Sequence, residues 1–232
     1  MDLFEAFPQL STVFQGRALR LIALSAIVYD DQAFYFESGD ARLWGRLPTG
    51  EVSIGIGAAK TSPDAHNSPS KLLSRHLRKH WACEVGLFDT RHTYILDETQ
   101  RQLPPPITTL DNMTPEMPYL LILTPPRLGG SSDVPDALAQ AVYLMPLRRW
   151  RGKSNTRLLR IHREALGNFL ANADWDLSAL QAQPWAQFLP GTALLDVAPE
   201  AARLRPVLAL RGLQHLLKMD AFPIHLNPST IN

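Results

Sequence analysis

The sequence predicts an α+β fold in which a mixed β-sheet is flanked by helices on both faces, as in an α/β/α sandwich. Two observations favour this class. Segments with the alternation and β-branched composition of strands come first, and one helical pattern interrupts them before more strands follow. Helical patterns then dominate the last third of the chain. This order differs from a regular βαβ series, which would predict a wholly parallel sheet.

The first strands are predicted before residue 60. The apolar segment 17–29 has the composition of a long core strand, and 32–36 follows it as a hairpin partner. Residues 45–59 are rich in glycine and alternate apolar with small residues, which predicts a strand between two turns. We therefore expect the sheet to begin with antiparallel pairs.

One amphipathic helix is predicted over residues 71–85, because its leucines recur at helical spacing along one stripe. Ser68 followed by Pro69 is a typical helix start, and Gly86 is a typical helix stop. Further strands are predicted at 90–96, 119–123 and 139–147, and further helices at 156–170, 178–189 and 200–217. Pro206 should kink or divide the last of these helices.

Composition limits the class of protein. The 232 residues are 45% hydrophobic and 19% charged, and 23 Lys and Arg balance 22 Asp and Glu, so a soluble globular chain is expected rather than a disordered one. The balanced charge gives no strong signal for nucleic acid or for a membrane surface as partner. Cys83 is the single cysteine, so no internal disulfide forms and a cytoplasmic location is expected. The apolar stretch 19–29 is too short to span a membrane.

Three segments resemble the Nudix hydrolase superfamily. They are RLWGRLPTGEVSIGIGAAK at 42–60, KHWACEVGL at 79–87 and AVYLMPLRRW at 141–150. The resemblance implies the Nudix fold over residues 1–170, with its core at 17–170. It also implies hydrolysis of nucleoside-diphosphate-linked compounds by Mg²⁺ or Mn²⁺ held by glutamates on one helix.

The Nudix box is degenerate in this chain. Aligned on its second half, the box has Glu84 in agreement, but Lys79, His80 and Cys83 stand where the family has an arginine and two glutamates. Upstream, Asp64 is the nearest carboxylate. One carboxylate among cations is a poor site for Mg²⁺, which prefers several oxygen ligands. The resemblance together with this departure predicts a binding module whose hydrolysis is lost or weakened.

Candidate site residues follow from the box and its surroundings. Glu84 is the candidate catalytic residue, and Glu84, His80 and Cys83 form a candidate zinc site if they share one helical face. Candidate ligands for a phosphate are backbone N–H groups of the glycine-rich segment and nearby cations. These phosphate-binding candidates are Gly55, Gly57, Lys60, Arg75 and Lys79.

Three functions remain open from the sequence alone. The first is a Nudix-like module that binds a nucleotide-diphosphate or another phosphorylated ligand, the second an active metal-dependent pyrophosphohydrolase, and the third a protein-interaction module. The basic stretch 148–163 has six Arg and one Lys, and it is either a surface for phosphates or an ordinary solvated face. Residues 171–232 are predicted to be a helical extension packed on the same domain, where they cover the core or form a homodimer interface.

Overall fold

The computed structural model describes residues 1–40, 52–55, 57–60, 68–88, 92–99, 107–108, 116–126, 135–172, 175, 177–190, 202–204 and 208–221. Its strands are β1 (Leu19–Tyr29), β2 (Ala33–Asp40), β3 (Val52–Gly55), β4 (Gly57–Lys60), β5 (Cys83–Val85), β6 (His92–Asp97), β7 (Ile107–Thr108), β8 (Leu120–Thr124), β9 (Ala137–Trp150), β10 (Arg157–His162), β11 (Ala186–Leu189) and β12 (Ala202–Leu204). Its helices are α1 (Leu3–Ala6), α2 (Pro69–His80), α3 (Leu166–Ala171), α4 (Leu177–Gln181) and α5 (Leu208–Lys218), with short 3₁₀ helices η1 (Pro8–Thr12) and η3 (Arg163–Ala165).

The strands form a mixed sheet in the order β11-β10-β2-β1-β9-β8-β6-β7. The central pair, β1 and β9, is parallel, whereas β2 and β8 pair with them in the antiparallel sense. Off this path, β4 pairs with β1, β3 with β2, and β5 with the far end of β9. The α+β class predicted from the sequence is confirmed by this arrangement.

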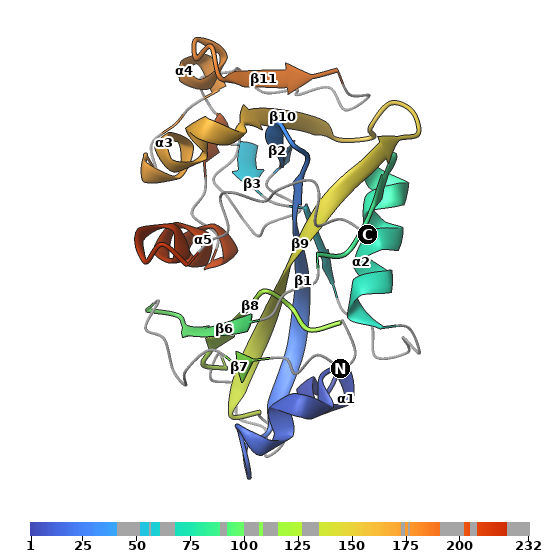
Figure 1. The fold of residues 1–232 in the computed structure, drawn as a ribbon, viewed down its shortest axis with the longest axis vertical. Coiled ribbons are helices and arrows are strands. Elements are labelled where there is room, and N and C mark those ends of the chain that lie inside the picture. The colour runs from blue at the N-terminus through green and yellow to red at the C-terminus, as the bar shows by residue number, and fades with distance from the viewer. Residues whose placement is uncertain are drawn as a thin grey trace.

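Helices cover both faces of the sheet, as Figure 1 shows: α2 lies on one side of the long strands β1 and β9, and α3 and α5 lie on the other. Each side has its own apolar core. Leu73, Leu77 and Trp81 bury themselves against one face, and Phe169 and Leu213 against the other. The α/β/α layering is therefore built from two cores that share the same strands.

Several predicted elements have different bounds in the structure. The predicted helix 71–85 ends early, because α2 stops at His80 and residues 83–85 form β5. The first half of the predicted helix 156–170 is instead β10, which pairs with β2. The predicted helices 178–189 and 200–217 each contain a strand besides a shorter helix; the strands are β11 and β12. Pro206 lies outside the described residues, between β12 and α5.

None of the helices in the described part of the chain has the length and hydropathy of a membrane span.

The close packing of α5 on the sheet leads to a prediction at Gly212. A Cβ at this position would lie 2.7 Å from Leu120 Cδ2 and 3.3 Å from Ile122 Cδ1. Overpacking costs about 1–3 kcal/mol, and the better helix propensity of alanine offsets about 1 kcal/mol of it. Gly212→Ala should therefore lower the free energy of unfolding by about 1 kcal/mol in urea denaturation.

Gly167 is the matched control for this substitution. It also lies in a helix, and a Cβ there meets no atom within 4 Å. Gly167→Ala should leave stability unchanged or raise it slightly. Equal stability of the two variants would contradict the tight docking of α5 against β8.

Candidate functional site

The end of α2 is shaped by the connection between β9 and β10, not by a glycine. The backbone N–H of Asn155 donates to the carbonyl of His80 at 2.8 Å, and the Ser154 hydroxyl donates to the same carbonyl at 3.1 Å. The Arg151 N–H donates to the carbonyl of Ala82 at 2.7 Å. Ala82 has φ +54, which turns the chain from the helix into β5. Residues remote in sequence thus satisfy carbonyls at the helix terminus.

Gly86, predicted as the helix stop, has another role. It lies beside β9, where its N–H donates to the carbonyl of Pro146 at 2.8 Å. A Cβ at this position would come within 3.2 Å of both Pro146 Cγ and Arg148 Nε. A larger residue here would therefore require the Pro146 and Arg148 side chains to shift by a few tenths of an ångström.

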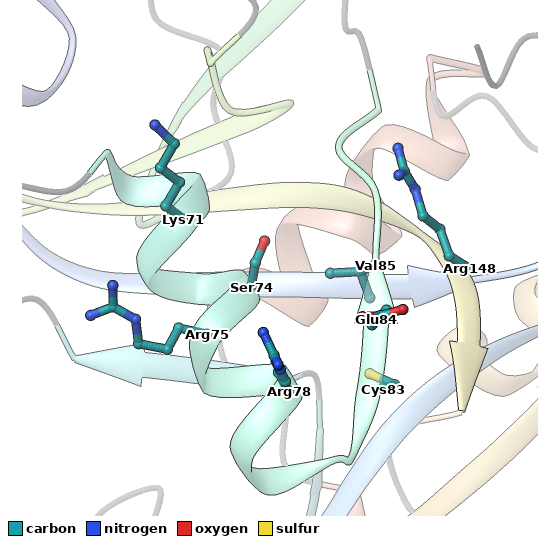
Figure 2. Close-up of a pocket in the computed structure, with 8 residues that line it drawn as sticks. All are labelled: Lys71, Ser74, Arg75, Arg78, Cys83, Glu84, Val85 and Arg148. Atoms are coloured by element: carbon teal, nitrogen blue, oxygen red, sulfur yellow. The ribbon is translucent and has the colours of Figure 1, made fainter. Parts of the chain in front are cut away.

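A cavity of about 420 Å³ lies between α2, β5 and the end of β9. Figure 2 shows that side chains of α2 line one side of it and those of β5 the other, with Arg148 contributed by β9. The lining residues are Lys71, Ser74, Arg75, Arg78, Cys83, Glu84, Val85 and Arg148. Four of them are cations and one is a carboxylate, so the cavity suits an anion.

Glu84, the single carboxylate of this cavity, is engaged by two arginines. Arg149 Nε donates to one carboxylate oxygen and Arg151 Nη2 to the other. Because β5 pairs with β9, Glu84 stands directly opposite Arg149 in the strand register. The carboxylate is thus already neutralised by cations of its own chain, which removes the negative charge that would attract a metal.

The predicted zinc triad does not share one helical face. His80 is the last residue of α2, whereas Cys83 and Glu84 belong to β5, so the assumption of one continuous helix is wrong. Cys83 is fully buried, and burial raises the pKa of its thiol to about 12, which keeps it protonated. Among the residues that the structure describes, no three His, Cys, Asp or Glu side chains are grouped to hold a metal ion.

The two histidines of α2 pack on each other. His76 and His80 stack with ring centroids 4.4 Å apart. Burial lowers the pKa of His76 to about 4, and the positive charges of His80 and Lys79 nearby lower it as well. Both rings are therefore neutral near pH 7, since the pKa of His80 is lowered as well, mainly by burial.

The donor set does not fit Mg²⁺ or Mn²⁺. These ions prefer several carboxylate or carbonyl oxygens, and this cavity offers one carboxylate that is already bound by two arginines. Asp64, the nearest carboxylate upstream of α2, lies outside the described residues.

The predicted phosphate ligands are distributed unevenly. Arg75 lines the cavity, whereas Lys79 is exposed on the last turn of α2 and does not line it. Gly57 belongs to β4, paired with Ala26 of β1, rather than to a turn. Gly55 ends β3, and Lys60 ends β4. The glycine-rich segment therefore contributes paired strands here.

Two residues, one lining the cavity and one buried under Trp81, carried no signal in the sequence. Arg148 belongs to a basic run that also fits an ordinary solvated face, and only the pairing of β5 with β9 brings it to the cavity. Glu37 lies on β2, is 4% exposed, and accepts a hydrogen bond from Trp81 Nε1 at 3.4 Å. Burial raises the pKa of Glu37 to about 7, although the Trp81 hydrogen bond opposes this.

Comparisons with known proteins identify similar folds but no close relative. No protein-family model matches the sequence, and no curated protein matches it. Similar solved structures include a NUDIX family hydrolase from Clostridium perfringens, with TM-score 0.35 and 12% identity over 64% of this chain and 85% of that one. They also include the E. coli ORF135 protein, with TM-score 0.37 and 12% identity over 88% of this chain and 93% of that one. Both TM-scores are below 0.5, so these likenesses carry no conclusion about function.

Proposed function

We propose that this protein is a Nudix-like module that binds a phosphorylated ligand, of the nucleoside-diphosphate-linked class, in the cavity beside α2 without hydrolysing it. The observation that carries the proposal is the charge of the cavity: Lys71, Arg75, Arg78 and Arg148 face a single carboxylate. Guanidinium groups bind phosphate oxygens through paired, charge-assisted hydrogen bonds. The Ser74 hydroxyl adds a neutral donor at the same wall.

The engagement of Glu84 by two arginines favours binding without turnover. A phosphoanhydride hydrolase needs divalent metal to offset the charge that develops on the phosphoryl group. Arg149 and Arg151 already bind the one carboxylate of this cavity, which the metal would need. Fixed positive charge would hold the ligand, but it supplies no activated water.

The proposal is tested with ADP-ribose and inorganic pyrophosphate as probes, by calorimetry and by thermal shift with and without Mg²⁺ or Mn²⁺. A ligand present at about 100 times its Kd should add about 2.7 kcal/mol of stability.

Arg75→Gln should weaken binding about tenfold, because it removes a charge-assisted contact. Arg211→Gln, on the exposed side of α5, is the matched control and should leave binding unchanged. Release of phosphate that requires metal would overturn the claim of binding without hydrolysis, and failure of both probes to bind would overturn the proposed site.

Glu84→Gln should strengthen binding, and this sign separates the binding module from an active hydrolase. The substitution removes one negative charge from the cavity and releases Arg149 and Arg151 for the ligand. For a well-hydrated site, one charge about 4 Å away is worth about 1 kcal/mol, or about fivefold in Kd.

Glu164→Gln changes the net charge equally at an exposed position on η3 and should leave the Kd unchanged. If Glu84 were instead a metal ligand, Glu84→Gln would weaken metal-dependent binding or turnover. A weaker Kd in this variant would therefore contradict the proposed role of the carboxylate.

A further inference from the structure

Cations from two distant segments form one surface in the fold. Residues 68–88 and 147–156 together contain eight Lys and Arg against Glu84 alone, whereas the whole chain carries a formal net charge of only +1. All eight cations are exposed. These eight residues form the basic surface: Lys71, Arg75, Arg78, Lys79, Arg148, Arg149, Arg151 and Lys153. The charge is therefore concentrated on one part of the molecule although the sequence as a whole is balanced.

The hydrogen bonds that end α2 make this surface continuous. Asn155 binds the carbonyl of His80 through its N–H, and its side-chain Nδ2 donates to the carbonyl of Lys79 at 3.3 Å. The connection between β9 and β10 is thus fixed against the last turn of α2. The cations of that connection extend the positive surface from the cavity to the end of the sheet, where β9 ends beside α2 (Figure 1).

An exposed tryptophan borders the basic surface. Trp150 is 37% exposed and has Arg149 and Arg151 on either side in the sequence. Tyr35 packs against it edge to face, with ring centroids 5.4 Å apart and an interplanar angle of 76°. Because neighbouring side chains of a strand point to opposite faces, the indole lies on the face away from the two guanidinium groups that bind Glu84. It offers a supported stacking platform at the border of the cations.

We infer that the basic surface binds single-stranded nucleic acid, with a base stacked on Trp150 and the backbone phosphates on the exposed cations of that surface. A folded protein partner fits less well, because protein interfaces bury an apolar centre. The other exposed large apolar residues in the described part of the chain, Val13, Ile22 and Met219, do not belong to the basic surface. A duplex fits less well too, because its bases are already stacked on each other.

The test uses the full chain and a short fluorescein-labelled oligo-dT, with anisotropy as the readout. Raising NaCl from about 50 to about 200 mM should weaken binding about 20- to 50-fold if three or four phosphates are contacted. Trp150→Leu should weaken binding about tenfold, whereas Trp150→Tyr keeps an aromatic face and should retain most of the affinity. Arg211→Gln on α5 is again the charge control.

Heparin and duplex DNA separate the alternatives. Heparin has charge but no bases, so its affinity should not change in Trp150→Leu, and the duplex should bind more weakly than oligo-dT. The ADP-ribose affinity should also survive Trp150→Leu, since Trp150 does not line the cavity.

Lys153→Gln is a second variant, at an exposed position, and it leaves the packing of Trp150 on Tyr35 unchanged. It should weaken the binding of oligo-dT and of heparin alike. No salt-sensitive binding of oligo-dT would overturn the inference. Equal affinity for heparin and oligo-dT, unchanged by Trp150→Leu, would overturn it too and would leave an acidic polymer or protein as the partner.

Discussion

At about pH 8, replacing Glu37 with glutamine is expected to raise the free energy of unfolding by about 2–3 kcal/mol. The carboxyl is 4% exposed, and Trp81 Nε1 donates to it at 3.4 Å. Burial raises its pKa from 4.5 to about 7, because the charged carboxylate is disfavoured in the folded state and not in the unfolded one. A difference of this size corresponds to about 3 kcal/mol. Glutamine has a similar shape and avoids the buried charge.

The sign of the pH dependence follows from the proton count. Between pH 4.5 and about 7 the folded state keeps the Glu37 proton that the unfolded state has lost, so stability falls as pH rises through this window. The advantage of Glu37→Gln should thus be largest above pH 7 and disappear below pH 4.5. His76 acts in the opposite direction, because its pKa is lowered and protonation as pH falls below 6.5 favours the unfolded state.

The His76 contribution is present in both proteins, so it cancels in the difference between Glu37→Gln and the unsubstituted chain. Urea denaturation of the two proteins across pH 4 to 8 gives that difference directly. A difference that stays constant with pH would mean that Glu37 does not titrate in the folded protein.

Strand positions in the central sheet were predictable because their signal is local. The segments that became β1, β2, β8 and β9 are apolar or alternating, and the expected antiparallel pairing of β1 with β2 is present. β10 was mistaken for a helix because its leucines bury themselves on both faces. Leu158 belongs to one core and Leu159 to the other, so no period-two pattern remains in the sequence.

The end of α2 could not be predicted for a different reason. Its start at Pro69 has a local signal, whereas its end depends on hydrogen bonds from Ser154 and Asn155, more than seventy residues away in sequence. The position of Glu84 depends on the same event, because the chain that leaves α2 becomes β5 and meets β9. Helical spacing therefore could not predict that Arg149 and Arg151 bind Glu84.

The positive charge of the cavity was predictable from the sequence, but the full set of residues that line it was not. Arg75 belongs to the helix whose basic composition is visible in the sequence, and it lines the cavity. Arg148 joins it only because β9 runs past α2, and Glu37 is buried only because β2 passes beneath Trp81. Long-range strand pairing decided both positions, and it leaves no trace in local composition.

Trp81→Ala is expected to cost about 3–5 kcal/mol of unfolding free energy, the usual cost of deleting a large buried aromatic side chain. Trp81 is fully buried at the C-terminal end of α2 and packs with Leu77 in the core between that helix and the sheet. The cavity left behind would remove the support of the turn that leads into β5.

Trp150→Ala is the matched control, because this tryptophan is 37% exposed and its loss should cost about 1 kcal/mol through the Tyr35 contact.

Trp81→Phe separates packing from hydrogen bonding, since it keeps an aromatic ring but removes the donor to Glu37. It should raise the Glu37 pKa further, because the Trp81 hydrogen bond lowers that pKa in the native chain. Stability curves of Trp81→Phe with and without Glu37→Gln, followed across pH, measure this coupling. An unchanged pH midpoint in Trp81→Phe would mean that the 3.4 Å contact contributes nothing to the carboxylate, and burial alone would then set its titration.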